Sequence, residues 1–157
     1  MPYQMRRKDR ELSQDDALAV LDRAPYGVLS TLDKNGGPYC IPLSLVREGQ
    51  WLYFHCARTG HKIDNLRTLG QVCAAFVGRT EFPEDDFTVH YESAVVFGRA
   101  EEITGDEEKI HCLRLICERF TPKNMAAFDA EIAKMLKATG VWKIRIESIT
   151  GKRREKM

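Results

Sequence analysis

The pattern of apolar and polar residues predicts a chain built mostly of β-strands. Alternation with a period of two, and short apolar runs bounded by Gly, Pro, Asn or Asp, are typical of strands. The longest such segment, residues 88–104, is expected to form one or two strands with a bulge or bend at Gly98. The strands are therefore expected at residues 26–32, 38–46, 51–57, 71–82, 88–104 and 141–152.

Apolar residues at helical spacing predict four helices between and after these strands. Ser13 precedes two acidic residues and an apolar pattern, so it is expected to cap the first helix. Gly140 is expected to end the last one as a C-cap. The helices are expected at residues 13–24, 61–69, 106–120 and 124–140.

Short polar turns at residues 33–37 and 47–50 indicate antiparallel pairing of consecutive strands. Pro42 interrupts the ladder of its strand, which points to an edge, a bulge or a break. Antiparallel sheets of six or seven strands tend to close or fold over, because this removes their edges. We therefore expect a mainly β fold, a small barrel with helices set around it, as one domain over residues 1–157. The absence of GxGxxG and GxxxxGK[ST] motifs argues against dinucleotide-binding and P-loop folds.

Composition places the chain among ordinary globular domains. It has 157 residues, 43% apolar and 30% charged, with a net charge of +1, so bulk charge favours neither nucleic acid nor membrane as a partner. Basic clusters near both ends are read as solvated termini. No apolar run is long enough for a membrane span or a signal region. Five cysteines without a CxxC pair indicate free thiols and a reducing cytoplasm.

The sequence RTGHK, residues 58–62, is the first candidate site. It lies between the strand at 51–57 and the helix at 61–69, where free backbone N–H groups and the helix dipole favour an anion. Arg58, Thr59, His61 and Lys62 would add cations and hydrogen-bond donors. These residues fit a phosphate site and a solvated polar turn equally well.

The remaining candidates are weaker when taken from the residues alone. His55 is either a hydrogen-bonded strand residue or part of a site at the end of its strand. Glu92 could reach a ligand or pair with a nearby cation. The four histidines are scattered, so no metal site is expected. Ser30 and Ser44 lack the G-x-S-x-G context of a hydrolase nucleophile.

Three longer motifs resemble a known family. DKNGGPYCIPLSLV, WLYFHCARTGHKIDNLR and HYESAVVFGRAEEIT resemble the flavin-binding split β-barrels of the pyridoxamine 5′-phosphate oxidase family. MRRKDREL, YESAVVFGRA and IESITGK are similar to the 5-nitroimidazole-resistance (Nim) proteins within it. The resemblance extends over residues 5–153.

The resemblance implies a six- to seven-stranded antiparallel split barrel, dimeric, with FMN bound at the interface of a homodimer. The strand around Pro42 would line the flavin ring, His55 and Cys56 would border it, and His61 with Lys62 would hold the phosphate. Ser93 would reach the flavin from the partner subunit, and Trp142 would lie near the ring. The implied cofactor-binding residues are Ile41, Pro42, Leu43, Ser44, His55, Cys56, His61, Lys62, Ser93 and Trp142.

Departures from the family pattern bear on function. His61 stands where the oxidases usually carry Arg, Ile41 and Val46 replace basic residues, Cys56 replaces a hydroxyl, and a C-terminal basic arm is missing. These changes weaken phosphate binding and favour a Nim-like reductase over vitamin B6 oxidation. We therefore expect an FMN-dependent reductase of small molecules such as nitroimidazoles or nitroaromatics, supplied with electrons from NAD(P)H, with His55 as the candidate proton donor. The alternatives are a non-catalytic module that binds FMN, haem or another planar cofactor, an oxidase-like enzyme, and a structural dimer with an empty cleft.

Overall fold

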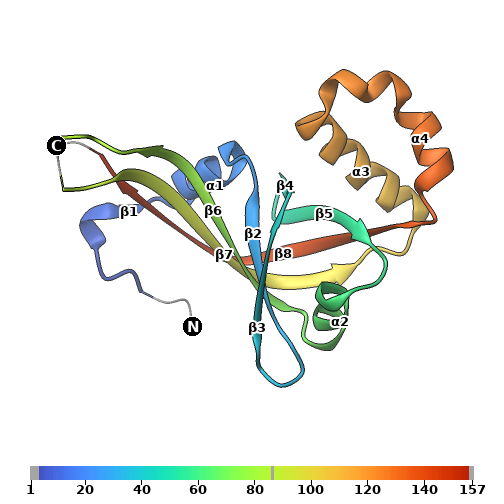
Figure 1. Cartoon of the computed structure of the whole chain (residues 1–157), viewed down its shortest axis with the longest axis horizontal. Coiled ribbons are helices and arrows are strands. Elements are labelled where there is room, and N and C mark those ends of the chain that lie inside the picture. The colour runs from blue at the N-terminus through green and yellow to red at the C-terminus, as the bar shows by residue number, and fades with distance from the viewer. Residues whose placement is uncertain (1–3, 86, 156–157) are drawn as a thin grey trace.

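A computed structural model describes residues 4–85 and 87–155 of the chain (Figure 1). The expected domain over residues 1–157 thus includes a few positions outside the described residues. The strands are β1 (Glu11–Leu12), β2 (Gly27–Leu32), β3 (Pro38–Leu43), β4 (Val46–Glu48), β5 (Trp51–Ala57), β6 (Gln71–Glu81), β7 (His90–Glu102) and β8 (Thr139–Arg154). The helices are η1 (Lys8–Arg10), α1 (Gln14–Arg23), α2 (His61–Thr68), α3 (Asp106–Phe120), η2 (Pro122–Ala127) and α4 (Phe128–Met135).

The strands form one antiparallel sheet in the order β3-β2-β6-β7-β8-β5-β4, with β1 added to β8. Its two edge strands, β3 and β4, are separated in the chain only by Ser44 and Leu45. Three residue steps can span at most about 10 Å, so the sheet must curl until its edges approach each other. The expected antiparallel split barrel with helices around it is confirmed.

The sheet has eight strands where six or seven were expected, because the segment 38–46 divides into two strands and β1 is added. β3 pairs with β2 and β4 pairs with β5, so the chain crosses from one edge of the sheet to the other. Pro42 lies on the edge strand, where its missing N–H removes no bond from the interior of the sheet. β1 has only two residues, too few to show a pattern.

The first helix begins as expected, since the Ser13 hydroxyl accepts a hydrogen bond from the Asp16 N–H at 3.1 Å. The prediction for the last helix was wrong. A 3-10 segment, η2, precedes the short α4, and Gly140 lies in β8 opposite Cys56 rather than at a C-cap. A Cβ atom at Gly140 would lie 3.2 Å from the Ala57 carbonyl oxygen, so close strand pairing accounts for this glycine.

Gly98 marks an irregularity in β7, as expected. The register between β7 and β8 shifts between Phe97 and Gly98. A Cβ atom at Gly98 would lie 2.1 Å from the Arg145 carbonyl oxygen, so only glycine fits this approach of the two backbones.

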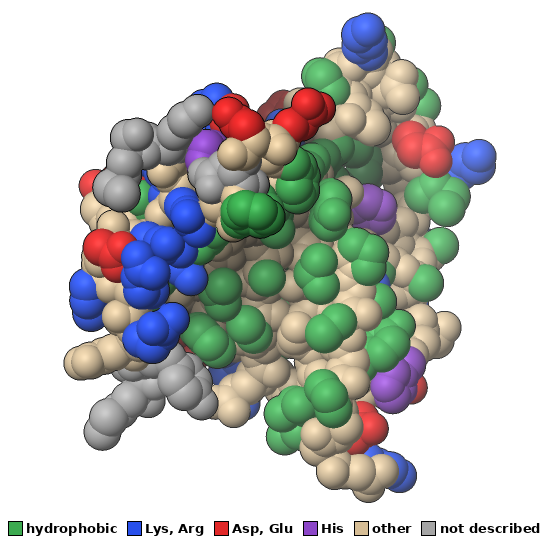
Figure 2. Space-filling view, turned by 60° about the vertical axis from the view of Figure 1, so that its left-hand side comes forward, with side chains coloured by type: hydrophobic (Ala, Val, Ile, Leu, Met, Phe, Trp, Pro, Cys, Tyr) green, Lys and Arg blue, Asp and Glu red, His purple; other side chains and the backbone are tan. Residues whose placement is uncertain are grey.

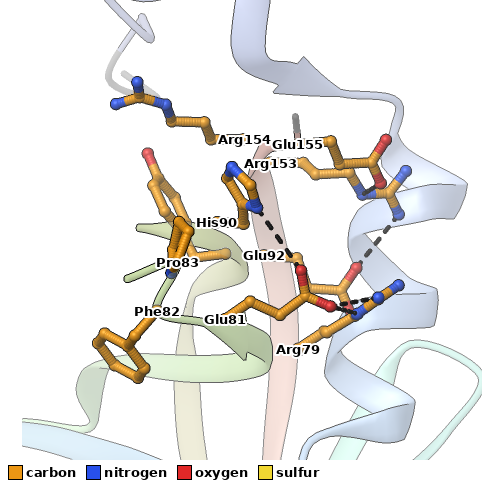
Figure 3. Close-up of a pocket in the computed structure, with 10 residues that line it drawn as sticks. Arg79, Glu81, Phe82, Pro83, His90, Glu92, Arg153, Arg154 and Glu155 are labelled. Carbon is orange, nitrogen blue, oxygen red and sulfur yellow. Dashed lines mark hydrogen bonds and ion pairs between the residues drawn. The ribbon is translucent and has the colours of Figure 1, made fainter. Parts of the chain in front are cut away.

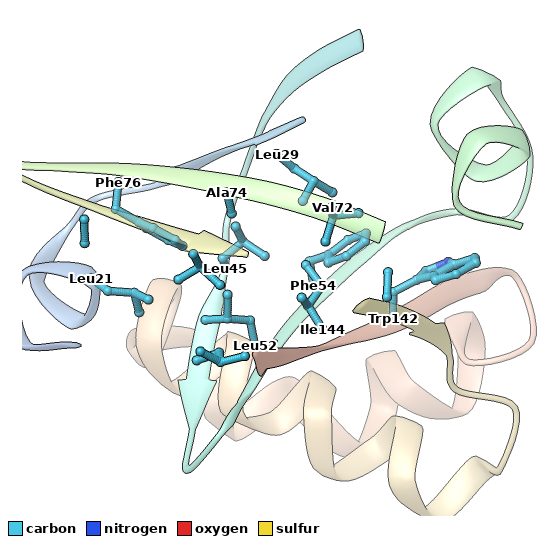
Figure 4. Packing of buried hydrophobic residues seen from close by; sticks show 14 of the residues in the cluster. Leu21, Leu29, Leu45, Leu52, Phe54, Val72, Ala74, Phe76, Trp142 and Ile144 are labelled. Carbon is cyan, nitrogen blue, oxygen red and sulfur yellow. The ribbon is translucent and has the colours of Figure 1, made fainter. Parts of the chain in front are cut away.

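Two hydrophobic clusters hold the molecule together. The larger fills the inside of the curled sheet, where Leu29, Leu52, Phe54 and Ile144 are completely buried (Figure 4). The smaller lies between the outer side of β5 and β8 and the lobe formed by α3, η2 and α4, and it includes Tyr53. Helices therefore cover only one part of the outer face of the sheet.

The outer face of β3, β2, β6 and β7 has no helix over it in the part of the chain that the structure describes. Cross-strand pairs such as Val28–Ala75, Ala75–Val95 and Cys73–Phe97 place alternate apolar side chains there. Figure 2 shows hydrophobic side chains lying across the hollowed middle of one face of the molecule. We call this surface the open face; it consists of Val28, Cys40, Pro42, Cys73, Ala75, Val77, Ser93, Val95 and Phe97.

None of the described helices is long and apolar enough to span a membrane.

Candidate functional site

The turn between β5 and α2 is the best-formed candidate for anion binding. Gly60 is the N-cap of α2. Its φ of +124° is a backbone conformation that residues other than glycine rarely adopt. Its carbonyl accepts hydrogen bonds from the N–H groups of Ile63 at 2.8 Å and Asp64 at 3.1 Å. The N–H groups of His61 and Lys62, in the first turn, have no acceptor within the helix. These two donors and the helix dipole are available for an anion.

The side chains of this turn bring α2 against two strands. Lys62 Nζ lies 5.6 Å from the centroid of the Phe54 ring, at the end of β5. The His61 ring meets the ring of Tyr39, on β3, edge to face with 4.7 Å between centroids. The end of β5, the edge strand β3 and the start of α2 therefore converge, although β3 and β5 lie near opposite ends of the sheet order.

Lys62 also influences the two candidate residues at the end of β5. Burial lowers the pKa of His55, and the Lys62 ammonium lowers it further. Burial raises the pKa of the Cys56 thiol, and Lys62 only partly opposes this effect. At neutral pH His55 is therefore mostly a neutral imidazole and Cys56 a thiol, which does not favour a thiolate nucleophile.

Arg58 does not share the site with Lys62. Its guanidinium donates a hydrogen bond to the Lys137 carbonyl at 3.1 Å and ties the turn to the segment before β8. The sequence grouped Arg58, Thr59, His61 and Lys62 together, but the structure directs Arg58 toward the helical lobe. The available cation of the turn is Lys62.

A buried polar link fixes α2 in place, and sequence reasoning missed it. The Asn65 amide donates to the Thr31 hydroxyl at 3.0 Å, and the same hydroxyl donates to the Tyr39 carbonyl at 3.3 Å. Asn65 and Thr31 are 3% and 2% exposed. The signal in the sequence was an amide between the apolar residues Ile63 and Leu66 on the buried side of a helix.

The predicted ring-binding residues lie on and beside the edge strand. Ile41 and Leu43 turn inward and pack against the main cluster, whereas Pro42 and Ser44 are exposed. Because β3 pairs only with β2 in the described sheet, its outer edge carries backbone groups that belong to no ladder, although Pro38 and Pro42 contribute C=O groups and no N–H. A planar ligand could take hydrogen bonds from that side.

Two predicted residues lie apart from this convergence. Ser93 pairs with Val77 and Lys152 on the open face, and β8 separates β7 from β5. Trp142 is 3% exposed and lies inside the main cluster, opposite Phe54 (Figure 4). Within the chain Ser93 thus does not lie beside His61, and the Trp142 side chain is buried rather than part of the surface.

A second polar group lies at the far end of β6, β7 and β8 (Figure 3). Burial would raise the pKa of Glu92, but hydrogen bonds from Arg23 and from the Arg79 N–H outweigh it and lower that pKa. Its carboxylate oxygens lie 2.9 Å from the Arg23 guanidinium and 3.3 Å from that of Arg153. Glu92 is therefore paired with cations, which makes this a structural network. The described residues contain no cluster of ligands that could hold a metal ion.

Comparison with known proteins relates the chain to one protein family. A family model described as pyridoxamine 5′-phosphate oxidase matches residues 13–153. No curated protein matches the chain.

Solved structures share the fold along most of the chain. A candidate 5-nitroimidazole antibiotic resistance protein from Bacteroides thetaiotaomicron VPI-5482 is 25% identical, with a TM-score of 0.76 over 90% of this chain and 85% of that one. The flavocytochrome Anf3 from Azotobacter vinelandii is 24% identical, with a TM-score of 0.77 over 98% and 73%. An FAD and heme binding protein from Mycobacterium smegmatis is 22% identical, with a TM-score of 0.76 over 94% and 74%.

Proposed function

The chain belongs to the pyridoxamine 5′-phosphate oxidase family, and on this basis we propose that it is an FMN-dependent reductase of small molecules such as nitroimidazoles and other nitroaromatics. The observation that carries the proposal is the convergence of the α2 N-terminus, Lys62 and the edge strand β3 at one end of the curled sheet. Similarity to the Bacteroides protein supports the choice of substrate class.

The residues present fit a phosphate at the start of α2. Two free N–H groups, the helix dipole and the Lys62 ammonium would each favour the anion. His61 lies against Tyr39 and would add a ring donor. With His61 in place of the arginine usual in the oxidases, the site has a weaker fixed charge, which fits a reductase better than an oxidase with tight phosphate binding.

The edge strand fits the planar part of the cofactor. Its unpaired backbone groups would donate to and accept from the polar edge of the ring. Pro42 is exposed on that strand and Ser44 directly after it, so their surfaces are accessible to a ligand. When bound, FMN supplies the redox chemistry, and the protein binds and orients the reacting groups.

A homodimer would complete the site. The open face is a contiguous apolar surface without a covering helix among the described residues, and such surfaces mark interaction sites. A second copy against it would bury Val28, Ala75 and Val95 and would bring Ser93 toward the cofactor of its partner. Light scattering that finds two chains per particle would support this arrangement, and a monomer would contradict it.

Replacing His55 by Gln is expected to slow nitro reduction while FMN stays bound. His55 acts as an acid in its protonated form, and its pKa lies below the ordinary value. The protonated fraction therefore rises as pH falls through that lowered pKa, by no more than about tenfold per pH unit. Turnover in the wild type should then increase from pH 7.5 toward pH 5.5 by at most about 100-fold. His55→Gln should lose this pH dependence. Unchanged turnover and an unchanged pH profile would exclude the role, and His111→Gln is the matched control on the exposed side of α3.

A binding module without turnover is the second candidate, favoured by the shared fold with the FAD and heme binding protein. Both readings predict a coloured protein. Bleaching by NAD(P)H followed by reoxidation that depends on a nitroimidazole would support only the reductase. A flavoprotein that is neither bleached nor reoxidised in this way would instead support the binding module.

A further inference from the structure

A cavity of about 500 Å³ lies between the end of β5 and the helical lobe. This volume is in the range of small-molecule sites, roughly 300–1,000 Å³. Leu113 and Phe128 form a buried part of its wall and are 8% and 5% exposed. The cavity is mostly apolar; its apolar lining residues are Leu113, Cys117, Ala127, Phe128, Ile132, Met135 and Leu136.

The charges around this cavity limit what it can bind. No Lys or Arg is among its described lining residues, and its one carboxylate is that of Glu131. Two cations beside the cavity are engaged elsewhere: Lys109 donates to the Leu136 carbonyl at 2.8 Å, and Arg114 stacks on Phe128 and pairs with Asp129 at 3.2 Å. An anionic ligand would lose its hydration without gaining a Lys or Arg partner in the described lining.

His55 connects this cavity with the candidate cofactor site. It lines the cavity, and it lies near the end of β5, the strand that leads into the turn at residues 58–62. Among the remaining polar groups of the lining, the Thr121 and Thr139 hydroxyls donate to the carbonyls of Cys117 and Met135 and can only accept from a ligand. The Asn124 amide can donate to one polar substituent. The ring of a bound molecule would therefore pack on apolar side chains with a substituent directed toward the imidazole.

We propose that the cavity between β5 and the α3–η2–α4 lobe binds a small, uncharged aromatic molecule and presents it to His55. Its role as the substrate pocket rests on the proposed reductase function, whereas the binding itself does not. The structure thus favours neutral nitro- or heteroaromatic substrates over phosphorylated or carboxylated ones. This preference also separates the chain from an enzyme that acts on a phosphate ester.

Two probes that share a ring test the proposal. We expect 4-nitrobenzyl alcohol to bind the full-length protein saturably, with or without added FMN, and 4-nitrobenzoate to bind at least about tenfold more weakly. On titration with the alcohol, the NMR signals of the His55 ring and the Met135 methyl should shift, while those of the His111 ring should not. Equal affinity for both probes, or shifts at His111 alone, would overturn the proposal. Because FMN is not needed for binding, a protein that takes up no flavin but binds the alcohol would refute the reductase and leave this site standing.

A variant that fills the cavity with a larger side chain provides a second test of the proposal. Ala127 lines the cavity and Ala130, one turn later on the exposed side of α4, does not. Ala127→Trp should weaken binding of 4-nitrobenzyl alcohol at least about tenfold, because the indole takes up the space of the ligand, while Ala130→Trp should bind as the wild type does. Undiminished binding by folded Ala127→Trp would contradict the assignment. If that variant does not fold, the shifts of His55 and His111 in the wild type decide.

Discussion

Lys62→Ala is expected to weaken FMN binding by about 10- to 150-fold, which corresponds to about 1.5–3 kcal/mol for a charge-assisted phosphate contact. Lys62 is the cation that remains available at the start of α2, because Arg58 is hydrogen-bonded to the Lys137 carbonyl. The loss should be larger at low salt, since added ions screen the attraction between ammonium and phosphate. Quenching of flavin fluorescence on titration would measure the dissociation constant.

The controls separate charge from packing. The Lys62 ammonium lies over the Phe54 ring, so Lys62→Met keeps an unbranched side chain of similar length there and removes the charge. It should weaken binding nearly as much as Lys62→Ala does. Lys34→Ala, in the exposed turn between β2 and β3, should leave the dissociation constant unchanged. If Lys62→Ala binds FMN as tightly as the wild type, residues 58–62 form a solvated polar turn.

Asn65→Ala is expected to lower the free energy of unfolding by about 1–3 kcal/mol, because it removes the amide that donates to the buried Thr31 hydroxyl. The same change frees α2 from the hairpin of β2 and β3, so FMN affinity should fall as well. Urea denaturation would measure the first effect, and the flavin titration the second.

A double-mutant cycle with Thr31→Val tests whether the two side chains act together. Residues joined by one hydrogen bond should show a coupling energy of about 0.5–3 kcal/mol. Strictly additive effects would mean that Asn65 stabilises α2 by some route other than Thr31.

Most of the fold followed from local patterns, because period-two alternation and helix caps are properties of short segments. The break within residues 38–46 did not. Pro42 indicated an edge, a bulge or a break in this segment, but Leu45 is buried and continues the alternation, so the alternation does not mark the point where the chain passes from one sheet edge to the other. That passage depends on the closure of the whole sheet, which only long-range pairing reveals.

The same distinction holds for Gly140 and for the site. A glycine after an amphipathic segment is typical of a helix C-cap, but here it lies in close pairing with the backbone of β5, a strand more than 80 residues earlier. Residues 58–62 could be placed at the start of a helix from sequence. Three other features depend on how distant parts of the chain meet and could not be placed. They are the contact of His61 with Tyr39, the hydrogen bond of Arg58 to the Lys137 carbonyl, and the burial of Trp142.

Titration of the purified protein with FMN tests the central claim most directly. We predict saturable uptake at one FMN per chain, accompanied by quenching of the flavin fluorescence and by absorbance in the flavin bands. A colourless protein that takes up no FMN at any concentration in the titration would contradict the claim, and the α2 turn would then have to be explained without a cofactor.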